Sequence, residues 1–129
     1  MVNLNGTLVV KEHATVAYDN RGLNYGDAVF ETIRVSAGKV LFWEDHYFRL
    51  MASMRILRME IPMTFTPEFL EDEVLKTVAA TKDSNNAQRA KIVVWRNEGG
   101  KYTPATNDVS FLITSETLDA PFYTISEAA

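Results

Sequence analysis

The chain has 129 residues, a formal net charge of −4 and a pI near 5.1. This length fits one domain with its own core, and a hydrophobic fraction of 47% is ordinary for a soluble globular protein. The acidic pI argues against a nucleic-acid-binding protein, and the lack of cysteine excludes disulfides, thiolate zinc sites and thiol nucleophiles. No apolar run approaches the roughly 20 residues of a membrane span.

The N-terminal residues 2–10 predict a β-hairpin, because β-prone segments flank Asn5-Gly6, a dipeptide that favours a two-residue turn. Residues 18–27 are polar, turn-rich and aromatic, which predicts a surface loop or a functional loop. We expect its glycines, Gly22 and Gly26, to adopt positive φ and to serve as scaffold.

A second pair of strands is predicted over residues 29–43. Side chains alternate in character over residues 29–36, so Glu31 and Arg34 fall on opposite faces of the predicted strand. The Ala37-Gly38 turn then leads into a partner strand over residues 39–43.

Two amphipathic helices follow. Residues 44–57 carry an apolar stripe at helical spacing, with carboxylates in the first turn. A second helix over residues 66–81 begins at Thr66, a favourable N-cap, with Pro67 at the first helical position. Residues 82–86 form a predicted loop.

The last third of the chain predicts two more strands, over residues 90–95 and 109–114, separated by a turn and a polar loop. The whole pattern predicts an α+β fold, with a mostly antiparallel sheet and two helices packed on one side. We expect residues 1–118 to form an N-terminal α/β domain and residues 119–129 to begin an interdomain linker.

Three segments in this order resemble the fold-type IV pyridoxal-phosphate enzymes, the class IV aminotransferase group. The segments are RGLNYGDAVFETIR (21–34), the turn at Gly38 and HYFRLMAS (46–53). This group holds branched-chain aminotransferases, D-amino-acid aminotransferases and aminodeoxychorismate lyases. The likeness is strongest over residues 20–57 and weaker from residue 91 to residue 114.

The resemblance implies that the chain is the small N-terminal domain of a two-domain subunit. In that family the larger C-terminal domain carries the lysine that holds pyridoxal 5'-phosphate, an acidic partner for the pyridine nitrogen and most of the phosphate-binding loops. None of these has a counterpart in this sequence, so we expect the C-terminal cofactor domain to be absent and the chain to hold no catalytic residue. The family's active site is completed by homodimerisation.

The resemblance also assigns Arg49 to the phosphate of the cofactor, for which its permanently charged, forked donor is suited. From spacing alone, a surface arginine in an exposed salt bridge is the commoner interpretation. His46 lies one helical turn away, and we interpret it as a packed, hydrogen-bonded residue near the helix start rather than a catalyst.

Four further residues are candidates for substrate binding. By resemblance, Tyr25 and Phe30 line the substrate pocket, sometimes across the dimer; the alternative is that both rings anchor the core or the loop. Arg34 either binds a substrate carboxylate or forms a cross-strand ion pair. Lys91 lies near the start of a strand where the family places polar substrate-binding residues, and it is not the cofactor lysine.

Two functions remain open. The first is a part in a pyridoxal-phosphate enzyme that transaminates an amino acid or eliminates pyruvate from aminodeoxychorismate. The second is a non-catalytic binding or regulatory remnant of that family. We expect a cytoplasmic homodimer without a metal site, nucleic acid or membrane as partner, because an apolar face that a larger domain would cover favours self-association.

Overall fold

The sheet and two helices of the fold are seen in a computed structural model, which describes residues 1–81 and 86–118. These residues form a six-stranded antiparallel sheet in the order β2-β1-β6-β5-β3-β4. The strands are β1 (Val2–Leu4), β2 (Thr7–Val9), β3 (Ala28–Ser36), β4 (Lys39–Val40), β5 (Gln88–Arg96) and β6 (Val109–Thr117).

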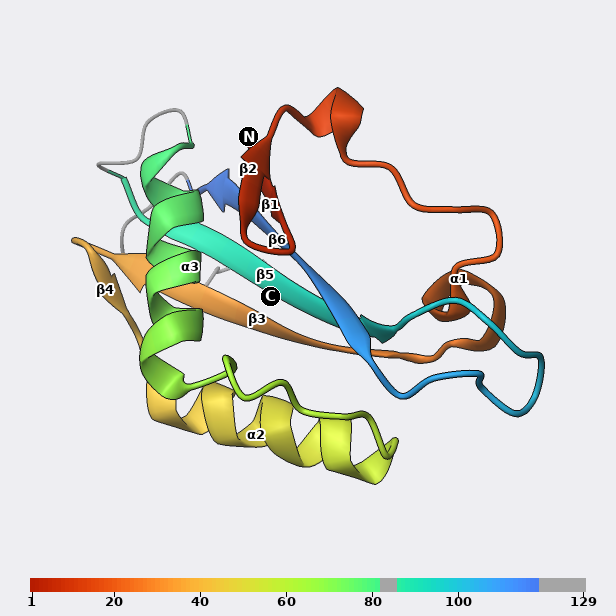
Figure 1. Cartoon of the computed structure of the whole chain (residues 1–129). Coiled ribbons are helices and arrows are strands. Elements are labelled where there is room, and N and C mark those ends of the chain that lie inside the picture. The colour runs from red at the N-terminus through yellow and green to blue at the C-terminus, as the bar shows by residue number, and fades with distance from the viewer. Residues whose placement is uncertain (82–85, 119–129) are drawn as a thin grey trace, which may run out of the picture.

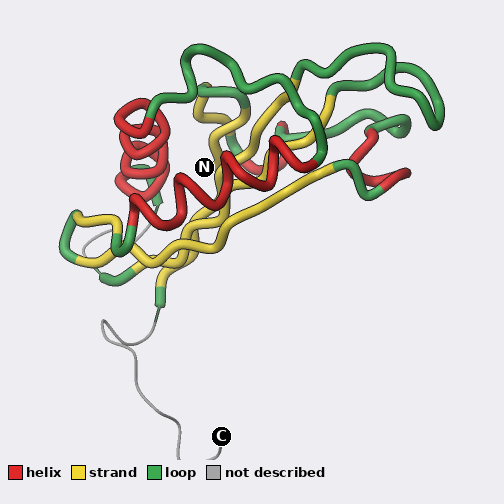
Figure 2. Tube along the Cα trace, turned by 90° about the horizontal axis from the view of Figure 1, so that it is seen from below, coloured by secondary structure: helices red, strands yellow, loops and turns green. Residues whose placement is uncertain are grey.

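Two long helices, α2 (Trp43–Ile56) and α3 (Pro67–Ala79), pack on the same face of the sheet (Figure 1, Figure 2). The predicted α+β fold is therefore confirmed. Two shorter elements, the 3-10 helix η1 (Lys11–His13) and the helix α1 (Arg21–Tyr25), lie between β2 and β3. The predicted linker at residues 119–129 and most of the predicted loop at 82–86 lie outside the described residues.

The predicted N-terminal hairpin is confirmed. Leu4 faces Thr7 across the turn, and the two turn residues have positive φ, 53° at Asn5 and 92° at Gly6. Such a turn matches the twist of the strands that it joins. β1 then pairs with β6, so the first and last strands of the described chain lie side by side.

The segment after β3 corrects one predicted boundary. The strand expected over residues 39–43 ends at Val40, because Phe42 adopts a left-handed conformation with φ of 56°. The chain enters α2 directly afterwards at Trp43, whose indole N–H donates to the carbonyl of Pro67 over 3.0 Å. That bond joins the start of α2 to the start of α3.

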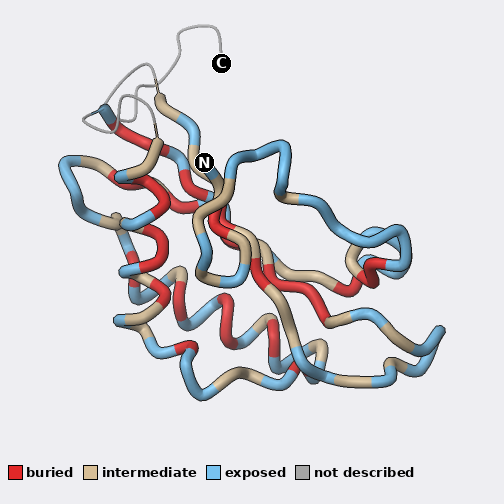
Figure 3. Tube along the Cα trace, turned by 45° about the horizontal axis from the view of Figure 1, so that its top comes forward, coloured by how far each residue is buried: buried red, intermediate tan, exposed pale blue. Residues whose placement is uncertain are grey.

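The core lies between the sheet and the two helices. Alternate residues of β3, β5 and β6 turn inward, and Figure 3 shows the buried stretches along these strands and along the helices. The Tyr47 hydroxyl donates to the carbonyl of Phe65, and burial raises the pKa of Tyr47 above its ordinary value of 10.0, so it stays a neutral donor at neutral pH. The most deeply buried side chains of the core include Ile33, Leu50, Met54, Leu70, Ile92 and Ile113.

The opposite face of the sheet carries neither α2 nor α3. We call it the open face. Strand alternation places one set of side chains from the three central strands there: Ala28, Phe30, Thr32, Arg34, Arg89, Lys91, Val93, Trp95, Ser110, Leu112, Thr114 and Glu116. Within residues 1–81 and 86–118, none of the helices has the length and apolar character needed to cross a membrane.

Candidate functional site

The first candidate site is a charged cluster between β3 and α2. Glu31, in the middle of β3, turns toward α2 and is largely buried. Arg49 Nε donates to both of its carboxylate oxygens, at 3.1 and 3.2 Å. His46 Nδ1 lies 2.7 Å from one of the same oxygens. One buried carboxylate therefore holds two side chains that project from successive turns of α2.

The proton positions in this cluster follow from the chemistry of its groups. An ionised carboxylate accepts hydrogen bonds and donates none, so the short contact to Glu31 assigns a proton to His46 Nδ1. The 3.4 Å contact between Arg49 Nη2 and His46 Nδ1 then joins two donors and is not a hydrogen bond. His46 thus fixes the carboxylate that anchors Arg49, in keeping with its structural interpretation.

Arg49 is held at its inner end and open at its outer end. Its side chain is 60% exposed although its carboxylate partner is only 10% exposed. Because Glu31 engages Nε, neither terminal nitrogen of Arg49 is used in the ion pair. A pre-oriented guanidinium with outward terminal N–H groups fits an incoming phosphate or carboxylate. Arg49 therefore differs from an ordinary surface arginine whose acidic partner is also exposed.

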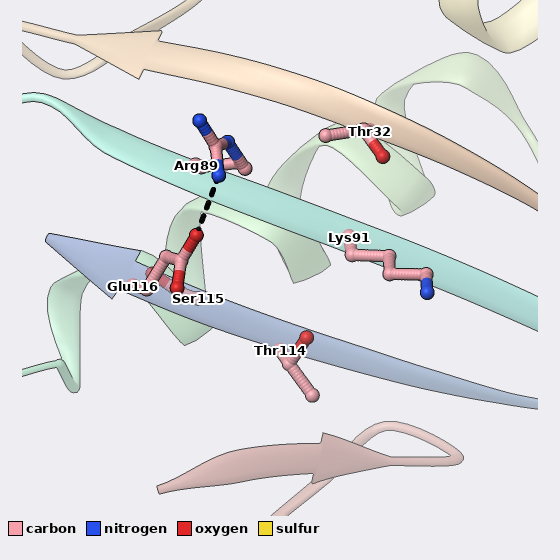
Figure 4. A pocket seen from close by; sticks show the side chains of 6 residues that line it. All are labelled: Thr32, Arg89, Lys91, Thr114, Ser115 and Glu116. Atoms are coloured by element: carbon pink, nitrogen blue, oxygen red, sulfur yellow. Dashed lines mark hydrogen bonds and ion pairs between the residues drawn. The ribbon is translucent and has the colours of Figure 1, made fainter. Parts of the chain in front are cut away.

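The second candidate site is a shallow hollow of about 280 Å³ on the open face (Figure 4). Thr32, Lys91 and Thr114 stand in register across β3, β5 and β6 and line it together. At its rim, Arg89 and Glu116 form an ion pair over 2.9 Å. The hollow is open and polar, with an ammonium group between two hydroxyl-bearing side chains.

Three of the predicted site residues come together on this face. The Lys91 ammonium lies 4.6 Å from the centre of the Phe30 ring, a cation–π arrangement. Arg34 is in register with Arg89 on the neighbouring strand. With Glu116 beyond Arg89, three cations and one carboxylate occupy neighbouring positions. Residue charges on this part of the open face therefore favour an anionic ligand.

Tyr25 lies apart from this hollow, at the end of α1. The predicted loop at residues 18–27 contains this short helix, which Asn20 caps at its start and Gly26 ends with φ of 66°. The expectation of positive φ was correct for Gly26 and wrong for Gly22. Gly22 is instead a packing glycine, because a Cβ there would lie 3.3 Å from that of Ala28 and 3.4 Å from that of Trp95.

Several residues of these sites were missed at the level of sequence. Arg89 had a usable signal, since it precedes Lys91 by two positions on the same strand and so shares its face. The bond from Arg49 to Glu31 spans 18 positions, and no local pattern reveals it. The same holds for Arg21, whose partners lie up to 80 positions away.

The comparisons with known proteins cover most of the chain. Residues 28–128 match the family described as "Amino-transferase class IV". A protein of Methanocaldococcus jannaschii, provisionally assigned as a branched-chain-amino-acid aminotransferase, is 36% identical over 100 residues, which are 76% of this chain and 33% of that protein.

Two solved structures extend this likeness to the fold. The branched-chain aminotransferase of the archaeon Thermoproteus uzoniensis, solved with norvaline, matches with a TM-score of 0.77 and 29% identity, over 90% of this chain and 40% of that one. The 4-amino-4-deoxychorismate lyase of Pseudomonas aeruginosa matches with a TM-score of 0.71 and 28% identity, over 91% of this chain and 40% of that one.

The chain spans about a third of the length of its curated relative and 40% of the length of both solved structures. The match to the family covers well over half of this chain, and the antiparallel sheet with its two helices is common to the solved structures. Further branched-chain aminotransferases of this fold have been solved with pyridoxamine 5'-phosphate or with N-(5'-phosphopyridoxyl)-L-glutamate. The chain belongs to the class IV aminotransferase family, whose cofactor is pyridoxal phosphate.

Proposed function

We propose that the chain serves as the N-terminal part of a pyridoxal-phosphate-dependent aminotransferase or aminodeoxychorismate lyase. In this role it contributes a contact to the cofactor phosphate and one wall of the substrate pocket. The observation that carries the proposal is Arg49, fastened to the buried Glu31 through Nε with its terminal nitrogens turned outward. When bound, the cofactor supplies an electron sink for the α-carbon of an amino-acid substrate.

Arg49 would bind the cofactor phosphate through its terminal N–H groups, and Glu31 would keep the guanidinium oriented. A bound phosphate that finds its donor already oriented loses less free energy to the ordering of that side chain. The buried partner also holds the arginine in the absence of a ligand, since Glu31 and His46 form their own hydrogen bond. Residues outside these 129 would complete the phosphate site and supply the lysine.

The open face would contribute the substrate wall. Lys91 and Arg34 would attract the carboxylate of an amino acid or of aminodeoxychorismate, and the Phe30 ring beside Lys91 would line the pocket. Tyr25 would reach the same pocket or that of a second subunit. An amino acid and aminodeoxychorismate both carry a carboxylate, so these residues support either reaction.

We further propose a homodimer in the cytoplasm. On the open face, three partly buried apolar side chains, Leu4, Val93 and Leu112, occupy neighbouring register positions without cover from α2 or α3. Apolar surface of this kind favours association. Light scattering of the chain at increasing concentration is expected to give twice the mass of the monomer; a strict monomer at high concentration would count against the dimer.

The test of the phosphate contact compares ligands that differ by one phosphate. Pyridoxamine 5'-phosphate is preferred to the aldehyde form because it does not react with surface lysines. We expect the chain to bind it at least about tenfold more tightly than pyridoxamine, since a hydrogen bond to a charged group contributes about 1.5–3 kcal/mol. An NMR titration measures both affinities and identifies the residues that respond.

The matched variants are Arg49→Met and Arg55→Met. Arg55 is an exposed arginine on the same helix, so its loss changes the net charge equally. Arg49→Met should remove the preference for the phosphorylated ligand, and Arg55→Met should keep it. Equal affinities of the unmodified chain for the two ligands, or equal losses in both variants, would refute the assignment of Arg49.

A further inference from the structure

A buried guanidinium joins two segments at the end of the sheet where α1 lies. Arg21, the first residue of α1, is 4% exposed. Its Nε donates to Asp27 over 2.9 Å, and its Nη1 donates to the carbonyls of Gly99 and Lys101 over 3.2 and 2.7 Å. Figure 1 shows α1 beside the loop between β5 and β6 that holds these carbonyls. Arg21 thus fastens α1 to a loop about 80 positions further along the chain.

Asp27 fixes Arg21 from the other side. Its carboxylate also accepts Arg96 Nη1 over 2.6 Å, and its carbonyl accepts the backbone N–H of Arg96 over 3.2 Å. Arg96 is the last residue of β5, so the pair is tied to the central sheet. A lysine at position 21 would lack the planar fork that reaches a carboxylate and two carbonyls together.

Two tyrosine rings depend on this guanidinium. The Tyr25 ring stacks over Arg21, with 4.6 Å from the guanidinium carbon to the ring centre. Tyr102 directly follows Lys101, whose carbonyl Arg21 holds, and its ring meets that of Tyr25 edge-on, with 6.4 Å between centres. Tyr25 is 47% exposed and Tyr102 is 94% exposed. Arg21 therefore contacts one ring and anchors the backbone next to the other.

The two rings border a hollow of about 440 Å³, to which Leu57 and Pro104 add apolar surface. A ring as exposed as that of Tyr102, on a surface loop, gains little from burial. Its place is set instead by the bonds beneath it and by the edge-on contact. Exposed tyrosines held in place in this way are typical of binding surfaces, because they add contact area at a small entropic cost.

We propose that Arg21 is a positioning residue that sets Tyr25 and Tyr102 as one aromatic wall, and that Tyr102 contacts the substrate beside Tyr25. The substrate part rests on the function proposed above, in which Tyr25 lines the pocket. The positioning part rests on the bonds of Arg21 alone. Tyr102 is thereby a substrate-contacting residue, and Arg21 acts through both rings without touching the substrate.

Fluorine NMR of the chain labelled with 3-fluorotyrosine tests the positioning. In the unmodified chain, Tyr25→Leu should shift the Tyr102 signal, because it removes the neighbouring ring. In the Arg21→Met and Arg21→Lys backgrounds the same substitution should leave that signal unmoved. Arg89→Met, which removes an exposed arginine of the open face, should preserve the coupling. Coupling that survives in folded Arg21→Lys, as judged by its melting transition, would overturn the positioning role.

Binding separates the substrate contact from the cofactor contact. The probes are N-(5'-phosphopyridoxyl)-L-glutamate, which joins cofactor and amino acid, and pyridoxamine 5'-phosphate, which lacks the amino-acid part. Arg21→Met and Tyr102→Leu should weaken binding of the first about three- to tenfold and leave the second unchanged. Tyr102→Leu alters an exposed side chain, so the test does not depend on the folding of an Arg21 variant.

The outcomes are distinguishable from a failure of the proposed function. If neither probe binds the unmodified chain, the proposed function fails and the substrate contact fails with it, while the fluorine coupling still decides the role of Arg21. If both probes bind and Tyr102→Leu affects them equally, Tyr102 is not a substrate contact.

Discussion

Replacing Asp27 with alanine is expected to lower the free energy of unfolding by about 3–5 kcal/mol, the loss typical of a buried ion pair deprived of one partner. Asp27 is buried and accepts hydrogen bonds from two buried guanidiniums, those of Arg21 and Arg96. Without the carboxylate, two positive charges remain in the interior with no acidic partner between them. Urea denaturation of the variant and the unmodified chain measures the difference.

Glu116→Ala is the matched control. Glu116 also pairs with an arginine, Arg89, but both side chains are more than half exposed. Water screens such a pair, so its loss should cost less than about 1 kcal/mol. If Asp27→Ala and Glu116→Ala destabilise the chain equally, the charged cluster around Asp27 does not support the fold.

The two long helices could be predicted because their signals are local. Thr66 and Pro67 mark the start of α3, and the Thr66 hydroxyl accepts the backbone N–H of Phe69 as a helix cap should. The start of α2 was less clear because the chain turns at Phe42 through a left-handed conformation that no sequence signal announced. Boundaries of this kind depend on how the neighbouring strand ends.

The short helix α1 was missed although its end signals are present. Asn20 and Gly26 are a favoured N-cap and a favoured C-terminal residue, but the helix between them has five residues and no apolar periodicity. The order of the strands was also beyond local reasoning. β1 lies beside β6, more than 100 positions away, and hydrophobic alternation does not specify that pairing.

The site residues divide in the same way. Lys91 and Phe30 could be assigned to the same face only once the register of β3 and β5 was known. The role of Arg49 came from family resemblance, and the buried carboxylate that orients it was not foreseen, because Glu31 lies on a different element. Sequence spacing finds neighbours within one helix or strand, whereas these contacts join two.

The chain is expected to hold the cofactor phosphate without attaching the cofactor to any of its own lysines. Covalent attachment needs an amine in a pocket that lowers its pKa. The six lysines of the chain are Lys11, Lys39, Lys76, Lys82, Lys91 and Lys101. All five that lie within the described residues are exposed. Lys76 is further tied by hydrogen bonds to Glu73 and to the carbonyl of Gly6.

The decisive measurement mixes the purified chain with pyridoxal phosphate, reduces the mixture with borohydride and maps the modified peptides. We expect sparse labelling spread over several exposed lysines and no turnover of an amino acid or of aminodeoxychorismate. Reversible binding of the phosphate should be lost in Arg49→Met. Stoichiometric labelling of one lysine, accompanied by turnover, would contradict the proposal that the chain supplies only part of the active site.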